Sequence, residues 1–169
     1  LAAASRDAAD LVVLDGRVYA AMRSSDAVAV VEQGAVVASV PAGVRPSAIG
    51  ASQPLGYVYV ASTEESTITV LAGREAVALW TLSDRPTALA CVGDHLWVGT
   101  DQGDLLQLRA SDGILVGRVA LGIQMSVLQI AAGQDGPLFA LTYGLLHVVD
   151  RSVGALQERI DLPGGLTFA

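Results

Sequence analysis

Short apolar segments run through the whole chain and are separated by turn residues. In the second quarter of the sequence they cover residues 46–51, 57–61, 67–71 and 77–82. The segment that begins at Thr67 alternates polar and apolar side chains, which is typical of a strand with one buried face. Asp15-Gly16 and Asp112-Gly113 separate such segments, and glycine supplies the positive φ of a tight hairpin there. No stretch has helical spacing, so the pattern predicts an all-β protein.

The same pattern returns about every 40 residues, which indicates a repeat architecture. Residues 43–49 (GVRPSAI) return at 83–89 (SDRPTAL) and, more loosely, at 122–128 (GIQMSVL). Four segments in each unit predict the four-stranded antiparallel blades of a β-propeller, since each blade covers the apolar faces of its neighbours. The four predicted units cover residues 8–43, 44–83, 84–122 and 123–163, with the start of a fifth at 164–169. We expect one repeat domain, an arc of a larger ring.

The remaining predicted strands lie at equivalent places in the other units. They are residues 11–14, 17–21, 27–31 and 35–40 in the first unit, 87–92, 96–99, 105–108 and 115–121 in the third, and 126–131, 138–141, 145–149 and 156–160 in the fourth. Interdigitation of neighbouring sheets predicts that Tyr59, Val60, Leu79, Val98 and Leu108 are core residues. Trp80 and Trp97 also lie within predicted strands, where stacking between blades is their expected task.

Two stretches resemble known propeller repeats. Residues 40–71 (VPAGVRPSAIGASQPLGYVYVASTEESTITVL) resemble the YVTN-type repeat, with its Gly-x-x-Pro turn, Tyr-Val-rich strand and polar hairpin. Residues 96–121 (LWVGTDQGDLLQLRASDGILVGRVAL) are similar to the blade repeat of pyrroloquinoline-quinone-type propellers. The resemblance implies the propeller fold. It does not imply one activity, because these families include enzymes, carriers and scaffolds.

Composition and charge narrow the classes of partner. The net charge is -7, and all ten basic residues are arginine. An acidic chain without a basic cluster is a poor match for nucleic acid, whose binding requires cations to displace counterions from phosphate. The chain is 52% hydrophobic and only 16% charged, which fits a surface covered in part by a protein partner or by further blades. The longest apolar stretch, residues 113–133, contains Arg118 and two glutamines, so we expect no transmembrane segment.

The first residues permit three interpretations. The start LAAAS is compatible with a mature end after removal of a signal peptide, with a trimmed chain or with an incomplete one. On the first interpretation the expected location is extracytoplasmic, in the periplasm of a bacterium or outside the cell.

The loops that lead into the innermost strands carry the candidate binding residues Arg45, Arg85 and Gln124 at equivalent repeat positions. If two or three of them point to the ring axis, they form a set of donors suited to a carboxylate or phosphate. The alternative is that each arginine pairs with a nearby acid, such as Asp84, or is simply solvated.

The other reactive side chains do not form a recognisable catalytic or metal set. Cys91 is the single cysteine, so it cannot form an intrachain disulfide, and it is expected to be a small buried residue. His95 and His147 lie in different units without a carboxylate at ligand spacing, and His147 is expected to be hydrogen-bonded or exposed. Residues 101–104 (DQGD) lack the further ligands of a calcium loop. We therefore predict no catalytic residues, no metal and no cofactor.

These observations favour a non-catalytic binding or assembly module that presents rigid loops to a protein partner. One alternative is an enzyme of the lactonase or quinoprotein dehydrogenase kind, whose ligands would converge on the axis from several blades. Another is a carrier or sensor with an apolar channel for a small ligand. We expect the ring to be completed by more residues of the same polypeptide, by a second copy or by a partner.

Overall fold

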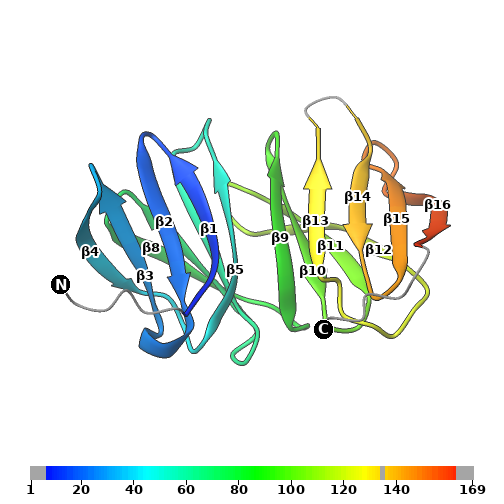
Figure 1. Cartoon of the computed structure of the whole chain (residues 1–169). Helices are drawn as coiled ribbons and strands as arrows, with labels where there is room; N and C mark the ends of the chain where they lie inside the picture. The colour runs from blue at the N-terminus through cyan, green and yellow to red at the C-terminus, as the bar shows by residue number, and fades with distance from the viewer. Residues whose placement is uncertain (1–6, 134–135, 163–169) are drawn as a thin grey trace. The chain divides into compact units, whose positions relative to one another are not determined.

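The computed structural model describes residues 7–133 and 136–162. This part of the chain contains sixteen β-strands and one short 3-10 turn, η1 (Arg23–Ser25). The strands form four antiparallel four-stranded sheets, each a meander of consecutive strands (Figure 1). The all-β prediction of four such sheets is confirmed. The predicted start of a fifth unit, at residues 164–169, lies outside the described residues.

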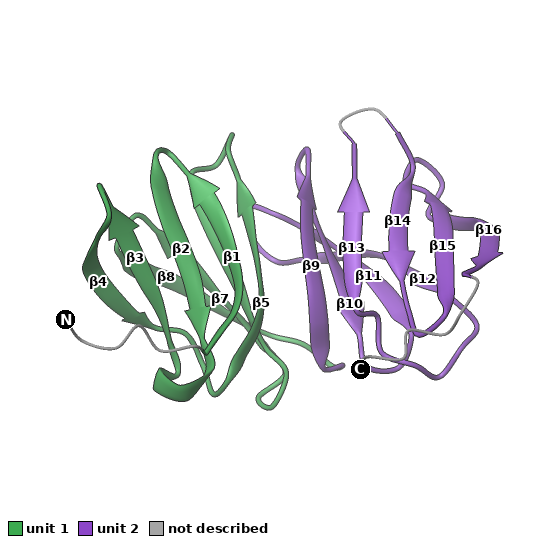
Figure 2. Cartoon of the chain, in the orientation of Figure 1, with its two compact units in different colours: residues 1–83 green, residues 84–169 purple. Residues whose placement is uncertain are grey.

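The chain divides into two compact units, Leu1–Ser83 and Asp84–Ala169, each containing two of the sheets (Figure 2). Unit 1 contains β1 (Ala8–Leu14), β2 (Arg17–Met22), β3 (Ala27–Glu32) and β4 (Ala35–Pro41) in its first sheet, and β5 (Pro46–Ser52), β6 (Tyr57–Ser62), β7 (Thr67–Ala72) and β8 (Glu75–Thr81) in its second. Unit 2 contains β9 (Pro86–Val92), β10 (His95–Thr100), β11 (Asp104–Arg109) and β12 (Leu115–Ala120), followed by β13 (Gln129–Ala132), β14 (Leu138–Leu141), β15 (Leu145–Asp150) and β16 (Ala155–Asp161).

One hydrogen bond closes every sheet in the same way. The residue before each third strand has a positive φ: Asp26 (52°), Ser66 (54°), Gly103 (81°) and Gly144 (80°). Its carbonyl oxygen accepts from a backbone N–H that follows the fourth strand, that of Ala42 (3.0 Å), Leu82 (2.8 Å), Leu121 (3.1 Å) and Leu162 (3.0 Å). The left-handed conformation therefore turns each carbonyl toward the chain that leaves the sheet.

A β-bulge recurs in the fourth strand of every sheet. The register between third and fourth strands shifts by one residue at equivalent places. The extra residues are Val37, Val77, Val116 and Gln157. The fourth strand is an edge strand, and a bulge there bends its unpaired backbone groups away from regular pairing with another chain.

Each unit has its own apolar core between its two sheets. In unit 1 the core contains Leu14, Tyr19 and Val28 from the first sheet and Ile49 and Val58 from the second. In unit 2 it contains Trp97, Leu105 and Val119 from the first sheet and Ile130, Leu138 and Val149 from the second. The pairing of sheets face to face excludes water from both, which is the main source of stability in such repeats.

Four of the five predicted core residues are buried, and one prediction was wrong. Tyr59, Val60, Val98 and Leu108 have at most 1% of their surface exposed. Leu79 is 63% exposed. It lies on β8, the edge strand of its sheet, in a run of five exposed residues that begins at Glu75. Apolar character on an edge strand therefore did not indicate burial.

Candidate functional site

In each unit the linker before a sheet lies against the loop that precedes a third strand. In unit 1 the N–H of Arg45 donates to Asp26 Oδ1 (2.8 Å), and the N–H of Val44 donates to Glu65 Oε2 (3.0 Å). In unit 2 the N–H of Asp101 donates to the carbonyl of Arg85 (3.0 Å). The linkers and loops therefore form one ordered loop face on each unit, and both predicted arginines lie on it.

Glycine is required where this loop face is tightest. A Cβ on Gly103 would lie 2.1 Å from the carbonyl oxygen of Ile123, and the φ of Gly103 is +81°. In unit 1 a Cβ on Gly43 would lie 2.8 Å from Ser62 Cβ. Only glycine permits this approach of two backbone segments.

The three predicted binding residues are all exposed, but they are not all in one unit. Arg45 belongs to unit 1, where its Nη1 lies 3.1 Å from Glu64 Oε1. This ion pair matches the alternative prediction of a neighbouring acid for Arg45. Arg85 and Gln124 belong to unit 2. The set of anion-binding donors therefore stays a prediction.

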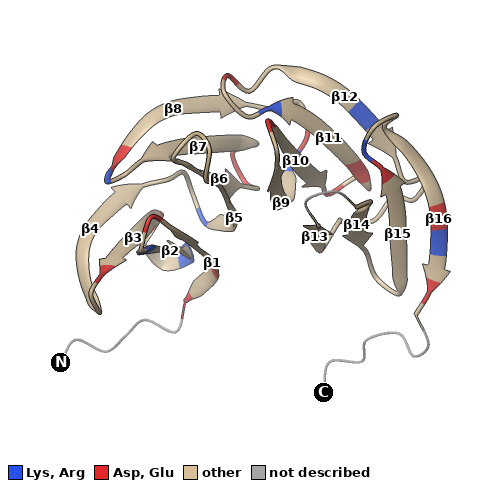
Figure 3. Cartoon of the chain, turned by 90° about the horizontal axis from the view of Figure 1, so that it is seen from above, with Lys and Arg blue, Asp and Glu red and all other residues tan. Residues whose placement is uncertain are grey.

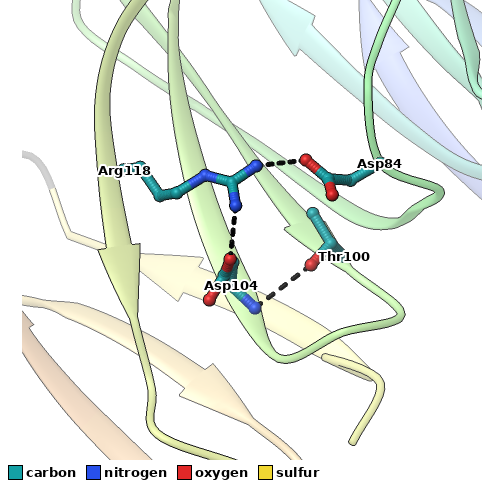
Figure 4. A network of polar contacts seen from close by, with 4 residues as sticks. All are labelled: Asp84, Thr100, Asp104 and Arg118. Atoms are coloured by element: carbon teal, nitrogen blue, oxygen red, sulfur yellow. Dashed lines mark hydrogen bonds and ion pairs between the residues drawn. The ribbon is translucent and has the colours of Figure 1, made fainter. Parts of the chain in front are cut away.

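The acid named as a possible partner, Asp84, binds a different arginine. Arg118 on β12 forms ion pairs with Asp84 and with Asp104, the latter at 2.8 Å (Figure 4). Asp104 also donates its backbone N–H to Thr100 Oγ1 at 3.1 Å. The network joins the edge strand to the linker before β9 and to the start of β11. Both carboxylates are therefore used in holding these segments together at the surface.

A second ion-pair network joins the two sheets of unit 1. Glu32 accepts from Arg17 and from Arg74, the latter at 2.8 Å. The hydrogen bond from Arg17, followed by that from Arg74, lowers the pKa of Glu32, and the bond to Glu32 raises the pKa of Arg17. All three side chains have part of their surface in solvent, so the network contributes more to positioning than to stability.

His147 is the buried ionisable group of unit 2. It is 0% exposed, and its Nε2 lies 3.1 Å from Thr142 Oγ1, as the hydrogen-bonded alternative predicted. Its Nδ1 has no partner among the described residues. Burial lowers the pKa of His147, and the charge of Arg159 lowers it further. Both effects favour the neutral form of the side chain.

A cleft of about 840 Å³ lies in unit 2, and the sequence did not predict it. Strands β10 to β12 line one side, and the β15–β16 turn with part of the β13–β14 turn lines the other. Asp150 at this cleft accepts from the N–H (2.8 Å) and hydroxyl (2.6 Å) of Ser152 and from Gln157. These bonds lower the pKa of Asp150, with the Ser152 hydroxyl as the largest cause. Asp150 thus stabilises its own turn.

The described residues contain neither a metal-binding cluster nor a membrane-spanning helix. Within residues 7–133 and 136–162 there is no group of three or more His, Cys, Asp or Glu side chains that could hold a metal ion. No helix in this part of the chain is long and apolar enough to span a bilayer.

The edge strands of unit 1 expose aliphatic side chains to solvent. Val36 and Val37 on β4 are 68% and 38% exposed, and Val77 and Leu79 on β8 are 52% and 63% exposed. The two strands belong to neighbouring sheets and contact each other. Figure 3 draws most of both in tan, whereas β16 carries blue and red bands. Glu75 is the one charged residue in these two strands. We call the four aliphatic residues the outer band.

Comparison with known proteins defines the class of fold. The chain is similar to the hydrazine synthase of Kuenenia stuttgartiensis, with a TM-score of 0.83 and 14% identity over 92% of this chain and 49% of that one. It is similar to the WD40 propeller domain of Doa1, with a TM-score of 0.79 and 18% identity over 91% of this chain and 53% of that one. It is also similar to the WD40 repeats of RRP9, with a TM-score of 0.78 and 15% identity. This match covers 94% of this chain and 51% of that one.

These likenesses establish a β-propeller repeat fold, as predicted. The chain spans about half the length of each of these three structures. No protein-family model matches the sequence, and no curated protein matches it. At such low identity the neighbours define the fold alone, because one fold carries many functions.

Proposed function

We propose that the chain is a non-catalytic β-propeller module that binds a protein partner, as a segment of a larger assembly. The observation that carries the proposal is the outer band. Four aliphatic side chains face solvent on two neighbouring edge strands that contain one charged residue. Apolar side chains that are exposed together in one patch often mark a protein-binding surface, whereas apolar side chains exposed singly are common on any protein surface.

The bulges favour side-chain contact over the addition of a strand. At Val37 and Val77 the edge backbone is interrupted, so a partner cannot extend the sheet in regular register. Both valines are exposed to solvent. The partner would therefore pack an apolar surface on the outer band, while the ordered linkers and loops contribute a polar rim.

Location and repeat type belong to the same proposal. Segments of this sequence resemble YVTN-type and pyrroloquinoline-quinone-type repeats. We propose that the assembly lies outside the cytoplasm. Cell fractionation with periplasmic and cytoplasmic marker proteins tests this part, and recovery with the cytoplasmic marker would contradict it.

A photo-crosslinking amino acid placed at Val77 or Val36 tests the binding surface. The matched control position is another valine, Val153, which is 72% exposed in the turn between β15 and β16. We expect both outer-band positions to crosslink one and the same protein, and the control position not to do so. The purified pair should then bind directly, and Val77→Asp should weaken binding by about tenfold or more. Equal crosslinking from Val153, or unchanged binding by the Val77→Asp variant, would refute the outer band as the interface.

A further inference from the structure

Every sheet pair in the structure uses the same two kinds of face. In unit 1 the first sheet presents Tyr19 and Val28, and the second sheet meets them with Ile49 and Val58. We call the first kind the exit face and the second kind the entry face. In unit 2 Trp97 and Leu105 form the exit face of the first sheet, and Ile130 and Leu138 form the entry face of the second. The interface within each unit is therefore of unlike faces.

An aromatic residue marks the exit face of all four sheets. In the pairing of second and third strands, Tyr19 lies opposite Val30, Tyr59 opposite Val70, Trp97 opposite Gln107 and Phe139 opposite Val148. Tyr19, Tyr59 and Trp97 have at most 1% of their surface exposed, whereas Phe139 is only half-buried. Phe139 therefore occupies the same repeat position as these three residues but is less buried than they are.

The rest of the fourth sheet's exit face is also incompletely covered. Leu146 and Val148 on β15 are half-buried, while Val28 and Leu105, the equivalents of Leu146, are fully buried. This apolar face is built like the other exit faces, so the surface that fits it is an entry face.

The first sheet of the chain presents an uncovered entry face. Leu11 pairs with the residue after Tyr19, as Ile49 pairs with the residue after Tyr59 and Ile130 with the residue after Phe139. Ile49 is 3% and Ile130 7% exposed, but Leu11 is 58% exposed. Val13, on the same face of β1, is 59% exposed. One chain therefore carries both halves of an interface that it forms elsewhere.

We propose that two copies of this chain associate head to tail, with the exit face of the fourth sheet of each copy packed on the entry face of the first sheet of the other. Unlike faces that repeat by rotation form a closed ring when the rotation closes. Two copies contribute eight sheets, within the range of about four to eight blades of closed propellers.

Native mass spectrometry and sedimentation of the 169-residue chain over a range of concentrations test the proposal. The expected species has twice the mass of 17.3 kDa. Phe139→Asp and Leu11→Asp should each raise the dissociation constant by about tenfold or more. Leu115→Asp, on the edge strand β12, is the matched control, because Leu115 is 53% exposed and lies outside both faces and outside the outer band. It should leave the dissociation constant unchanged. Mixing the Phe139→Asp and Leu11→Asp chains should partly restore association, because each retains the face that the other lacks.

Circular dichroism shows whether each variant is folded, and Phe139→Ser and Leu11→Ser replace any aspartate variant that is not. A monomer at all concentrations would overturn the proposal, as would species larger than two copies. Association that survives both face variants, or that Leu115→Asp abolishes, would also overturn it.

Discussion

Leu71 and Leu79 provide a matched test of how the sheets of unit 1 pack. Both are leucines of the same sheet, on the neighbouring strands β7 and β8, but Leu71 is 0% and Leu79 is 63% exposed. Leu71→Ala removes about three buried carbon groups, worth roughly 0.8 kcal/mol each, and the cavity adds to this cost. We expect a loss of about 2–5 kcal/mol. Only about a third of the Leu79 side chain is buried, so Leu79→Ala removes about a third as much burial free energy. We expect it to lower the free energy of unfolding by about 1 kcal/mol or less.

Urea unfolding followed by tryptophan fluorescence measures both free energies, and Trp80 reports on unit 1. With a denaturant slope of about 1–3 kcal/mol/M, Leu71→Ala should lower the midpoint by roughly 1 M or more. The midpoint of Leu79→Ala should lie close to that of the parent chain. Equal losses for the two variants would refute the reasoning, because they would mean that Leu79 is covered in solution or that the strand register is different.

Three further predictions concern single side chains. Gly103→Ala should lower the free energy of unfolding by about 2 kcal/mol more than Gly34→Ala. Both glycines have a φ near +80°, but only at Gly103 would the added Cβ press against Ile123. Equal urea midpoints for the two variants would contradict this. Burial lowers the pKa of His147, so the unfolded chain takes up a proton that the folded chain excludes, and stability is lost as the pH falls below the ordinary value of 6.5. His147→Gln should flatten urea midpoints measured between about pH 7 and pH 5, and a variant profile as steep as the parent's would exclude His147 as the cause. Arg118→Ala should lower the free energy of unfolding by less than about 1 kcal/mol, and added salt should reduce the difference between the variant and the parent chain. A larger loss that salt does not change would show that the Arg118 network is not a surface ion-pair network.

Local strand content was predictable because strand periodicity is a local property. The predicted segments 57–61 and 67–71 correspond to β6 (Tyr57–Ser62) and β7 (Thr67–Ala72). Agreement was poorest at 126–131, where β13 covers only Gln129–Ala132. There the N–H of Val127 donates to the carbonyl of Thr100 (3.0 Å), so an apolar stretch serves as a linker instead of a strand. A contact with a residue of the preceding sheet leaves no trace in local alternation.

The candidate site was less predictable than the fold. Equivalent repeat positions placed Arg45 and Arg85 on linkers, but the Arg45–Glu64 pair depends on how a loop folds back. The cleft beside Asp150 and the burial of His147 likewise depend on side chains brought together from several strands. Such groupings have no signature in spacing along the chain.

The repeat period, the antiparallel meander and the glycine hairpins follow from the sequence by itself, because each depends on residues that are close along the chain. The exposure of an apolar side chain does not. Leu79 and Leu71 are chemically identical, and only the position of each strand in its sheet decides that one is a solvent-facing edge residue and the other a core residue. Likewise Phe139 repeats the position of Tyr19, but cover for an aromatic residue comes from a neighbouring sheet. Burial is a property of surfaces that meet in three dimensions, so the tertiary structure decided it.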